Sequence, residues 1–142
     1  MNTNVGAKRV LFYGDSLVYG KASGVNQRLD VTVRFTGLVQ SELGSDYEII
    51  EEGLRARTLS GENAFFPERN GLDQFAPILG SHLPLDLLII ALGTNDANAG
   101  SQPSSESIAV ALDQYQRKVH EWCEFLAIDP PKVLFVIPPN ID

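Results

Sequence analysis

A chain of 142 residues is long enough for one domain with a buried core and too short for two. Its formal net charge of −7 at pH 7 argues against a nucleic-acid partner and against an anionic membrane surface, because both would repel it. Cys123 is the single cysteine, so an intrachain disulfide is excluded and no oxidising compartment is required. The first predicted strand begins near Lys8, which leaves no room for a secretory signal, and we therefore expect a cytoplasmic protein.

The first predicted element is a buried strand that delivers a serine at its end. Residues 10–13 are apolar without polar alternation, which is typical of a strand covered on both faces in a parallel sheet. Gly14 then permits a tight turn, and Ser16 follows. Ligands of open α/β sheets bind beyond the carboxyl ends of the strands, so Ser16 is a candidate nucleophile. The alternative is that Ser16 only caps the next helix.

A loop and a helix are predicted before the second strand. Residues 17–24 contain two glycines and small side chains, which indicates a mobile loop at the mouth of a site or an ordinary surface connection. Apolar residues recur at helical spacing over residues 34–43, and Gly44 marks the end of this covering helix. The second strand, residues 47–50, runs into Glu51-Glu52-Gly53, which we interpret as a functional loop, with a solvated strand end as the alternative.

The middle of the chain predicts an irregular segment, a helix and a central strand. Residues 58–71 lack periodicity and suit a binding loop, in which Phe65 and Phe66 either line an acyl pocket or pack the loop down. A helical stripe covers residues 72–79. The third strand, residues 86–92, is almost wholly aliphatic and is therefore expected at the centre of the sheet.

The last part of the chain predicts one long helix and a fourth strand. Residues 103–106 supply hydroxyl caps and a first-turn carboxylate, and the helix that follows has an apolar packing face. Prolines 130 and 131 stop it, and residues 132–137 form the fourth strand. Alternating strands and helices predict an α/β protein with a parallel sheet: a flavodoxin-like, three-layer α/β/α sandwich.

Three short motifs resemble the first three sequence blocks of the SGNH (GDSL) hydrolases. They are Gly14-Asp15-Ser16-Leu17, Gly53 and Gly93-Thr94-Asn95-Asp96, in the order and spacing of that family. Residues 51–58 and 82–86 are similar to its arylesterase and acyltransferase branch. The resemblance implies the strand order 2-1-3-4-5 with the fifth strand missing here, so residues 1–142 would be a single, C-terminally incomplete SGNH hydrolase domain.

The resemblance also implies the parts of an ester-cleaving site. Ser16 would be the nucleophile, and its own N–H, the N–H of Gly53 and the side-chain amide of Asn95 would be the oxyanion donors. Neighbouring strands lie about 4.8 Å apart, so three strand ends can converge on one carbonyl. Leu17 and Leu54 are placed in the substrate pocket. No cofactor is implied, and the histidines and the cysteine do not have the spacing of metal ligands.

The chain departs from the family where the general base is expected. The family carries an Asp-x-x-His block near its C-terminus, and neither His82 nor His120 has an aspartate three residues earlier. Each histidine is also expected about 20 Å from the site, from the rise of the strand or helix that separates them. We therefore expect that the catalytic Asp and His are not in this chain and that residues 1–142 alone are close to inactive.

These patterns favour a serine esterase that cleaves short-chain carboxylic esters through a Ser16 acyl-enzyme, with acyl transfer to alcohols as an extension. The alternatives are a carbohydrate-ester deacetylase and a non-catalytic SGNH-like binding module that lacks the base. A glycosidase that uses Asp15 and Asp96, and a phosphate binder at residues 14–16, rank lower because the aspartates suit loop-holding roles and the phosphate-loop glycines are absent. The expected partner is a small-molecule ester, and a homo-oligomer is left open.

Overall fold

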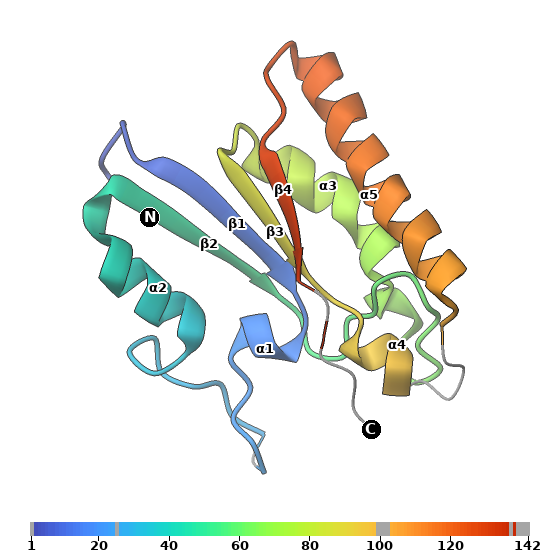
Figure 1. The fold of residues 1–142 in the computed structure, drawn as a ribbon. Coiled ribbons are helices and arrows are strands. Elements are labelled where there is room, and N and C mark those ends of the chain that lie inside the picture. The colour runs from blue at the N-terminus through green and yellow to red at the C-terminus, as the bar shows by residue number, and fades with distance from the viewer. Residues whose placement is uncertain (1, 25, 99–102, 137, 139–142) are drawn as a thin grey trace.

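The computed structural model describes residues 2–24, 26–98, 103–136 and 138. Four parallel strands form one sheet in the order β2-β1-β3-β4 (Figure 1). They are β1 (Lys8–Gly14), β2 (Tyr47–Gly53), β3 (Leu87–Ala91) and β4 (Lys132–Val136). This order confirms the arrangement predicted for the first four strands.

The strand register places the ends of three strands level with one another. Gly14, the last residue of β1, pairs with Gly53 of β2 on one side and with Ala91 of β3 on the other. All three strands are parallel, so their carboxyl ends share one edge of the sheet. The segments that leave this edge are where the fold can assemble a site.

Helices cover both faces of the sheet (Figure 1). The helices are α1 (Ser16–Tyr19), α2 (Phe35–Leu43), α3 (Gly71–His82), α4 (Thr94–Asn98) and α5 (Ser105–Leu126), with short 3₁₀ turns at η1 (Gly44–Asp46) and η2 (Pro67–Arg69). α3 and α5 pack side by side on one face, and α2 lies on the other. The predicted three-layer α/β/α sandwich is confirmed. No helix within the described ranges is long and apolar enough to cross a membrane.

The larger core lies between the sheet and the α3/α5 layer. Tyr13 of β1, Phe75 of α3 and Tyr115 of α5 are fully buried and pack edge to face or tilted, with ring centroids 4.7–6.3 Å apart. Both tyrosine hydroxyls donate to backbone carbonyls, that of Gly71 at 2.6 Å and that of Leu59 at 2.7 Å. Burial raises the pKa of both phenols, so they stay neutral donors that tie the core to the start of α3 and to the loop at Leu59.

The helix α2 is confirmed in position, but polar groups hold much of it to the sheet. Of its apolar residues, Phe35 contacts the Phe12 ring of β1 edge to face, with ring centroids 5.6 Å apart, and is 41% exposed, whereas Leu38 is 48% exposed. Thr36 is buried instead, and its hydroxyl binds the Glu51 carboxylate on β2. Arg34, just before α2, pairs with the same carboxylate at 2.6 Å. The acidic end of β2 therefore anchors α2 through polar contacts, which the spacing of apolar residues alone did not predict.

Candidate active site

Ser16 is the first residue of α1 and lies directly beyond β1. The helix is capped by Asp15, whose carboxylate accepts the Leu17 N–H at 2.9 Å. The interpretation of Ser16 as the cap is therefore wrong, and residues 17–19, expected in a mobile loop, are helical. A side chain at Gly14 would come within 2.9 Å of the Ala91 carbonyl oxygen, so the turn into α1 requires glycine there.

Asp15 is buried beneath this turn. Burial raises the pKa of its carboxyl, and the hydrogen bond from Leu17 and the nearby Arg57 charge act in the opposite direction. A carboxylate that caps α1 from the interior fixes the start of the helix. Ser16 itself is half-buried, whereas Leu17 is 66% exposed. The pocket-lining roles given to Leu17 and Leu54 stay predictions.

Asn95 is brought to the same edge by α4, which follows β3. Its Nδ2 donates to the Arg57 carbonyl at 2.9 Å and to the Asp15 carboxylate at 3.4 Å. The second contact joins Asn95 to the residue that precedes Ser16, across 80 positions of sequence. The fold therefore ties the Asn95 amide to the loop that carries Ser16, and the oxyanion role of Asn95 stays a prediction.

Asp96 holds a loop rather than facing the site. Its buried carboxylate accepts backbone N–H groups of Leu59 at 2.6 Å, Gly61 at 3.0 Å and Ser60 at 3.3 Å. A carboxylate that accepts several backbone hydrogen bonds is stabilised in its charged form, and its oxygens are not available to a substrate. Because Asp15 is likewise committed to a cap, this arrangement disfavours the glycosidase alternative, which requires two carboxylates free for the substrate.

The direction of the Gly53 N–H disfavours the oxyanion role predicted for it. The next N–H, that of Leu54, points toward β1 and donates to the Gly14 carbonyl at 3.1 Å. Successive N–H groups of a strand point to opposite sides, so the Gly53 N–H points to the open edge of β2, as does that of Ile49. A Cβ on Gly53 would lie 2.5 Å from Tyr19 Cα. The close approach of the α1 backbone therefore explains why residue 53 is glycine.

A turn just after β2 offers a different backbone donor. The Arg57 N–H donates to the Leu54 carbonyl at 3.1 Å, and Ala56, the third residue of this turn, has φ +62°. That is the left-handed region, which a type II turn requires at this position and which favours glycine. Strained residues of this kind cluster at functional sites. The turn's own hydrogen bond does not use the Ala56 N–H, and no sequence motif had indicated this residue.

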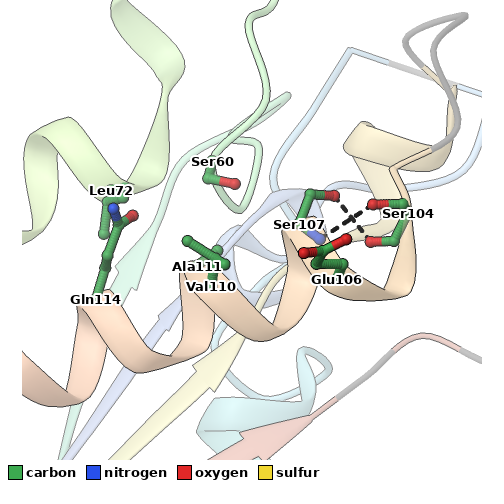
Figure 2. A pocket seen from close by; sticks show the side chains of 8 residues that line it. All are labelled: Ser60, Leu72, Ser104, Glu106, Ser107, Val110, Ala111 and Gln114. Atoms are coloured by element: carbon green, nitrogen blue, oxygen red, sulfur yellow. Dashed lines mark hydrogen bonds between the residues drawn. The ribbon is translucent and has the colours of Figure 1, made fainter.

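A surface pocket of about 560 Å³ lies near this edge, along the first half of α5 (Figure 2). It is lined by Ser60, Leu72, Ser104, Glu106, Ser107, Val110, Ala111 and Gln114. Its lining does not include Ser16 or Asn95, and we do not assign the substrate to it.

Phe65 is 86% exposed, so the interpretation that its side chain packs the loop over residues 58–71 down is wrong. Phe66 lies under the Arg69 guanidinium at 3.7 Å.

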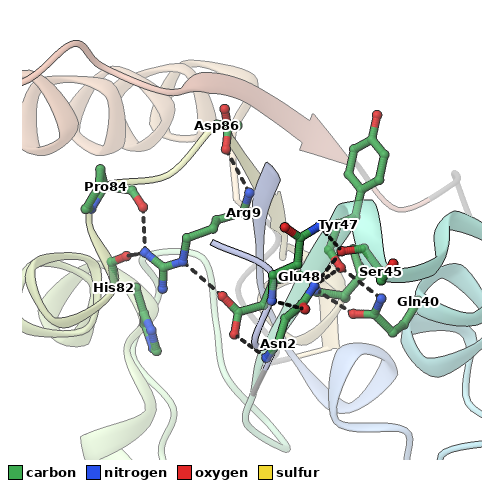
Figure 3. Close-up of polar contacts among 11 residues, drawn as sticks. Asn2, Arg9, Gln40, Ser45, Tyr47, Glu48, His82, Pro84 and Asp86 are labelled. Carbon is green, nitrogen blue, oxygen red and sulfur yellow. Dashed lines mark hydrogen bonds and ion pairs between the residues drawn. The ribbon is translucent and has the colours of Figure 1, made fainter. Parts of the chain in front are cut away.

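The two histidines occupy other places in the fold. The His82 carbonyl accepts from Arg9, at the start of β1, at 2.6 Å (Figure 3). Its ring meets the carboxylate of Glu52, near the carboxyl end of β2, at 2.8 Å. His120 is exposed on α5. In the part of the chain that the structure describes, neither histidine is hydrogen bonded to Ser16, and the expected inactivity of residues 1–142 alone stays a prediction.

Several known structures share this fold. An aryl esterase of M. smegmatis in its native form superposes with a TM-score of 0.83 at 39% identity, over 94% of this chain and 65% of its own. Est24, a carbohydrate acetylesterase from Sinorhizobium meliloti, gives 0.83 at 38% identity, over 93% of this chain and 64% of its own. A putative arylesterase from Agrobacterium tumefaciens gives 0.82 at 32%, over 93% and 64%.

Over 93–94% of its length the chain is similar to aryl esterases and carbohydrate acetylesterases of the SGNH hydrolase family. The esterase AlinE4, a member of that family, shares the fold at a TM-score of 0.57 and 23% identity. No protein-family model and no curated protein matches the chain. The chain spans slightly less than two thirds of the length of the first three SGNH hydrolase relatives above, at 65%, 64% and 64%. The family resemblance read from the motifs is confirmed.

Proposed function

We propose that this protein is an SGNH-type serine ester hydrolase with Ser16 as its nucleophile. The observation that supports it best is the hydrogen-bonded link between the loops after β1 and β3. The Asn95 amide donates to the carboxylate of Asp15, the residue before Ser16. The ends of β1 and β3 lie level with each other, which brings the two loops that carry these residues together. A hydroxyl beside an oriented amide donor is the arrangement that acyl transfer requires.

In this mechanism, the Ser16 hydroxyl attacks the ester carbonyl, and negative charge develops on the carbonyl oxygen. One hydrogen of the Asn95 amide is held by the Arg57 carbonyl at 2.9 Å, which fixes the plane of the amide. The other points toward Asp15 over a long 3.4 Å contact that a developing oxyanion can replace. The backbone donors that we propose beside the Asn95 amide are the Ser16 N–H and, in place of the Gly53 N–H, the Ala56 N–H. The Ser16 proton would pass to the histidine of the Asp-x-x-His block that the family resemblance implies and that residues 1–142 do not contain. That histidine returns the proton to the departing alcohol, and a water molecule, deprotonated by the same base, cleaves the acyl-enzyme to the free acid.

We further propose that the substrates are short-chain carboxylic esters, and that alcohols can accept the acyl group. The support is the kinship with an aryl esterase. A carbohydrate-ester deacetylase is the second candidate, because Est24 is called a carbohydrate acetylesterase and is equally similar. A comparison of kcat/KM on aryl acetates and on acetylated sugars separates the two.

Labelling with a fluorophosphonate probe tests the proposal, because such probes react only with an activated serine. The full-length protein should be labelled at Ser16 and should hydrolyse 4-nitrophenyl acetate. Ser16→Ala should lose both properties with an unchanged unfolding temperature, since the change removes one hydroxyl from the first turn of α1. A wild-type protein that is neither labelled nor active would instead support the non-catalytic binding module.

A further inference from the structure

Arg57 is a buried cation beside the candidate site. Only 3% of the residue is exposed. Its guanidinium donates to the carbonyls of Glu52 at 2.5 Å and Gly14 at 3.0 Å, and to the Gln74 side chain at 3.1 Å. Its Cζ lies 4.2 Å from the centroid of the Tyr13 ring. All of these partners are neutral, and no carboxylate of the described residues forms an ion pair with it.

A buried guanidinium without a paired carboxylate is an expensive feature of a fold. Arginine stays protonated in proteins, so the charge cannot be discharged to reduce the cost of burial. An apolar side chain in the same place would avoid that cost. Its three hydrogen bonds and the nearby charges of Glu52 and Asp15 offset part of that cost, and the location of Arg57 in the fold suggests a further role.

The contacts of Arg57 join the ends of three strands. Gly14 closes β1, and Glu52 is the residue before the end of β2, so the side chain bridges two neighbouring strand ends. The backbone carbonyl of Arg57 accepts from Asn95, which lies in α4 after β3. The guanidinium holds its donors in a rigid fork that suits two diverging carbonyls, whereas a lysine ammonium is a point donor.

We propose that Arg57 is a positioning residue for the ester-cleaving site. Its side chain fastens the turn over residues 54–57 to the ends of β1 and β2, and the Arg57 carbonyl thereby sets the orientation of the Asn95 amide. The Ala56 N–H lies in the same turn and is fixed by the same anchor. Oxyanion donors act through their preset geometry, so a small displacement of this turn reduces the rate. The inference rests on the proposed function.

Arg9 provides a matched control at the other end of the same strand. Its guanidinium donates to the carbonyls of His82 and Pro84, both at 2.6 Å, and pairs with Glu48 at 3.0 Å (Figure 3). It therefore clamps backbone carbonyls as Arg57 does, but far from Ser16 along β1. Arg9→Met and Arg57→Met each remove one such clamp, and Arg57→Lys keeps the charge without the fork.

The test uses the full-length protein and compares these three variants with wild type. Arg57→Met and Arg57→Lys should each lower kcat on 4-nitrophenyl acetate and the rate of fluorophosphonate labelling by about 10²-fold, the loss typical of one oxyanion donor. KM should change by less than about threefold, because the donors act on the transition state. Arg9→Met should keep the wild-type kcat and labelling rate. The side-chain amide resonances of Asn95 should shift in Arg57→Lys and stay in place in Arg9→Met.

A folded Arg57→Met protein with wild-type kcat and labelling rate would overturn the proposal. If Arg57→Met does not fold, Arg57→Lys decides: a loss of similar size supports positioning, and wild-type rates overturn it. Equal losses in Arg57→Met and Arg9→Met would show a general effect of lost stability and would also overturn it. A wild-type protein without labelling or turnover would refute the ester-hydrolase function instead, and the Asn95 resonances would still test whether Arg57 positions that amide.

Discussion

Gly53→Ala separates a packing role for Gly53 from a role as hydrogen-bond donor. The added Cβ would lie 2.5 Å from Tyr19 Cα, whereas ordinary contacts of this kind begin at 3.4 Å. The backbone of β2 or of α1 must therefore move by about 1 Å, and overpacking of this size costs about 1–3 kcal/mol. For a domain of this length, that lowers Tm by roughly 3–12 °C. Because α1 begins at Ser16, the labelling of Ser16 by a fluorophosphonate should slow as well.

Thermal unfolding followed by circular dichroism, together with the labelling rate, measures both effects. Gly6→Ala is the control, because a Cβ there meets its nearest neighbour, the Asn4 side chain, at an ordinary 3.5 Å. We expect its Tm and labelling rate to match wild type. A Gly53→Ala protein with unchanged Tm would refute the packing argument, since the clash is with backbone that a side-chain rotation cannot relieve.

Two further changes test the donor and the acidic anchor. Asn95→Ala should lower kcat on 4-nitrophenyl acetate by about 10²-fold or more with a smaller effect on KM, and an unchanged kcat with a raised KM would make Asn95 a ground-state binding residue. Glu51 has a pKa held below its ordinary 4.5, chiefly by its hydrogen bond with Arg34, so its contribution to stability is present above that pH and is lost as the pH falls through the lower, folded value. Glu51→Gln should therefore flatten the decline of Tm in acid, and an acid profile identical to that of wild type would contradict this role.

The sequence by itself determined the sheet and the two side chains at its edge. The uninterrupted apolar runs before Gly14 and over residues 87–92 require strands buried on both faces, and such strands occur in parallel sheets with helices on each side. Parallel strands end at one edge, so Ser16 and Asn95 could be placed together from their positions after two strands. The helix over residues 34–43 followed equally from local spacing.

The tertiary structure alone decided which backbone groups face the site. The N–H groups of a strand alternate between its two sides, so the role of Gly53 depends on the pairing of Leu54 with Gly14, which no local pattern encodes. The left-handed φ of Ala56 is likewise absent from the sequence, because alanine carries no turn signal. From the sequence alone Arg57 would be expected on the surface, as most arginines are. In the fold it is buried between the segments at the ends of three strands. Such contacts join residues from 5 to 43 positions apart, and only the register of the packed sheet brings them together.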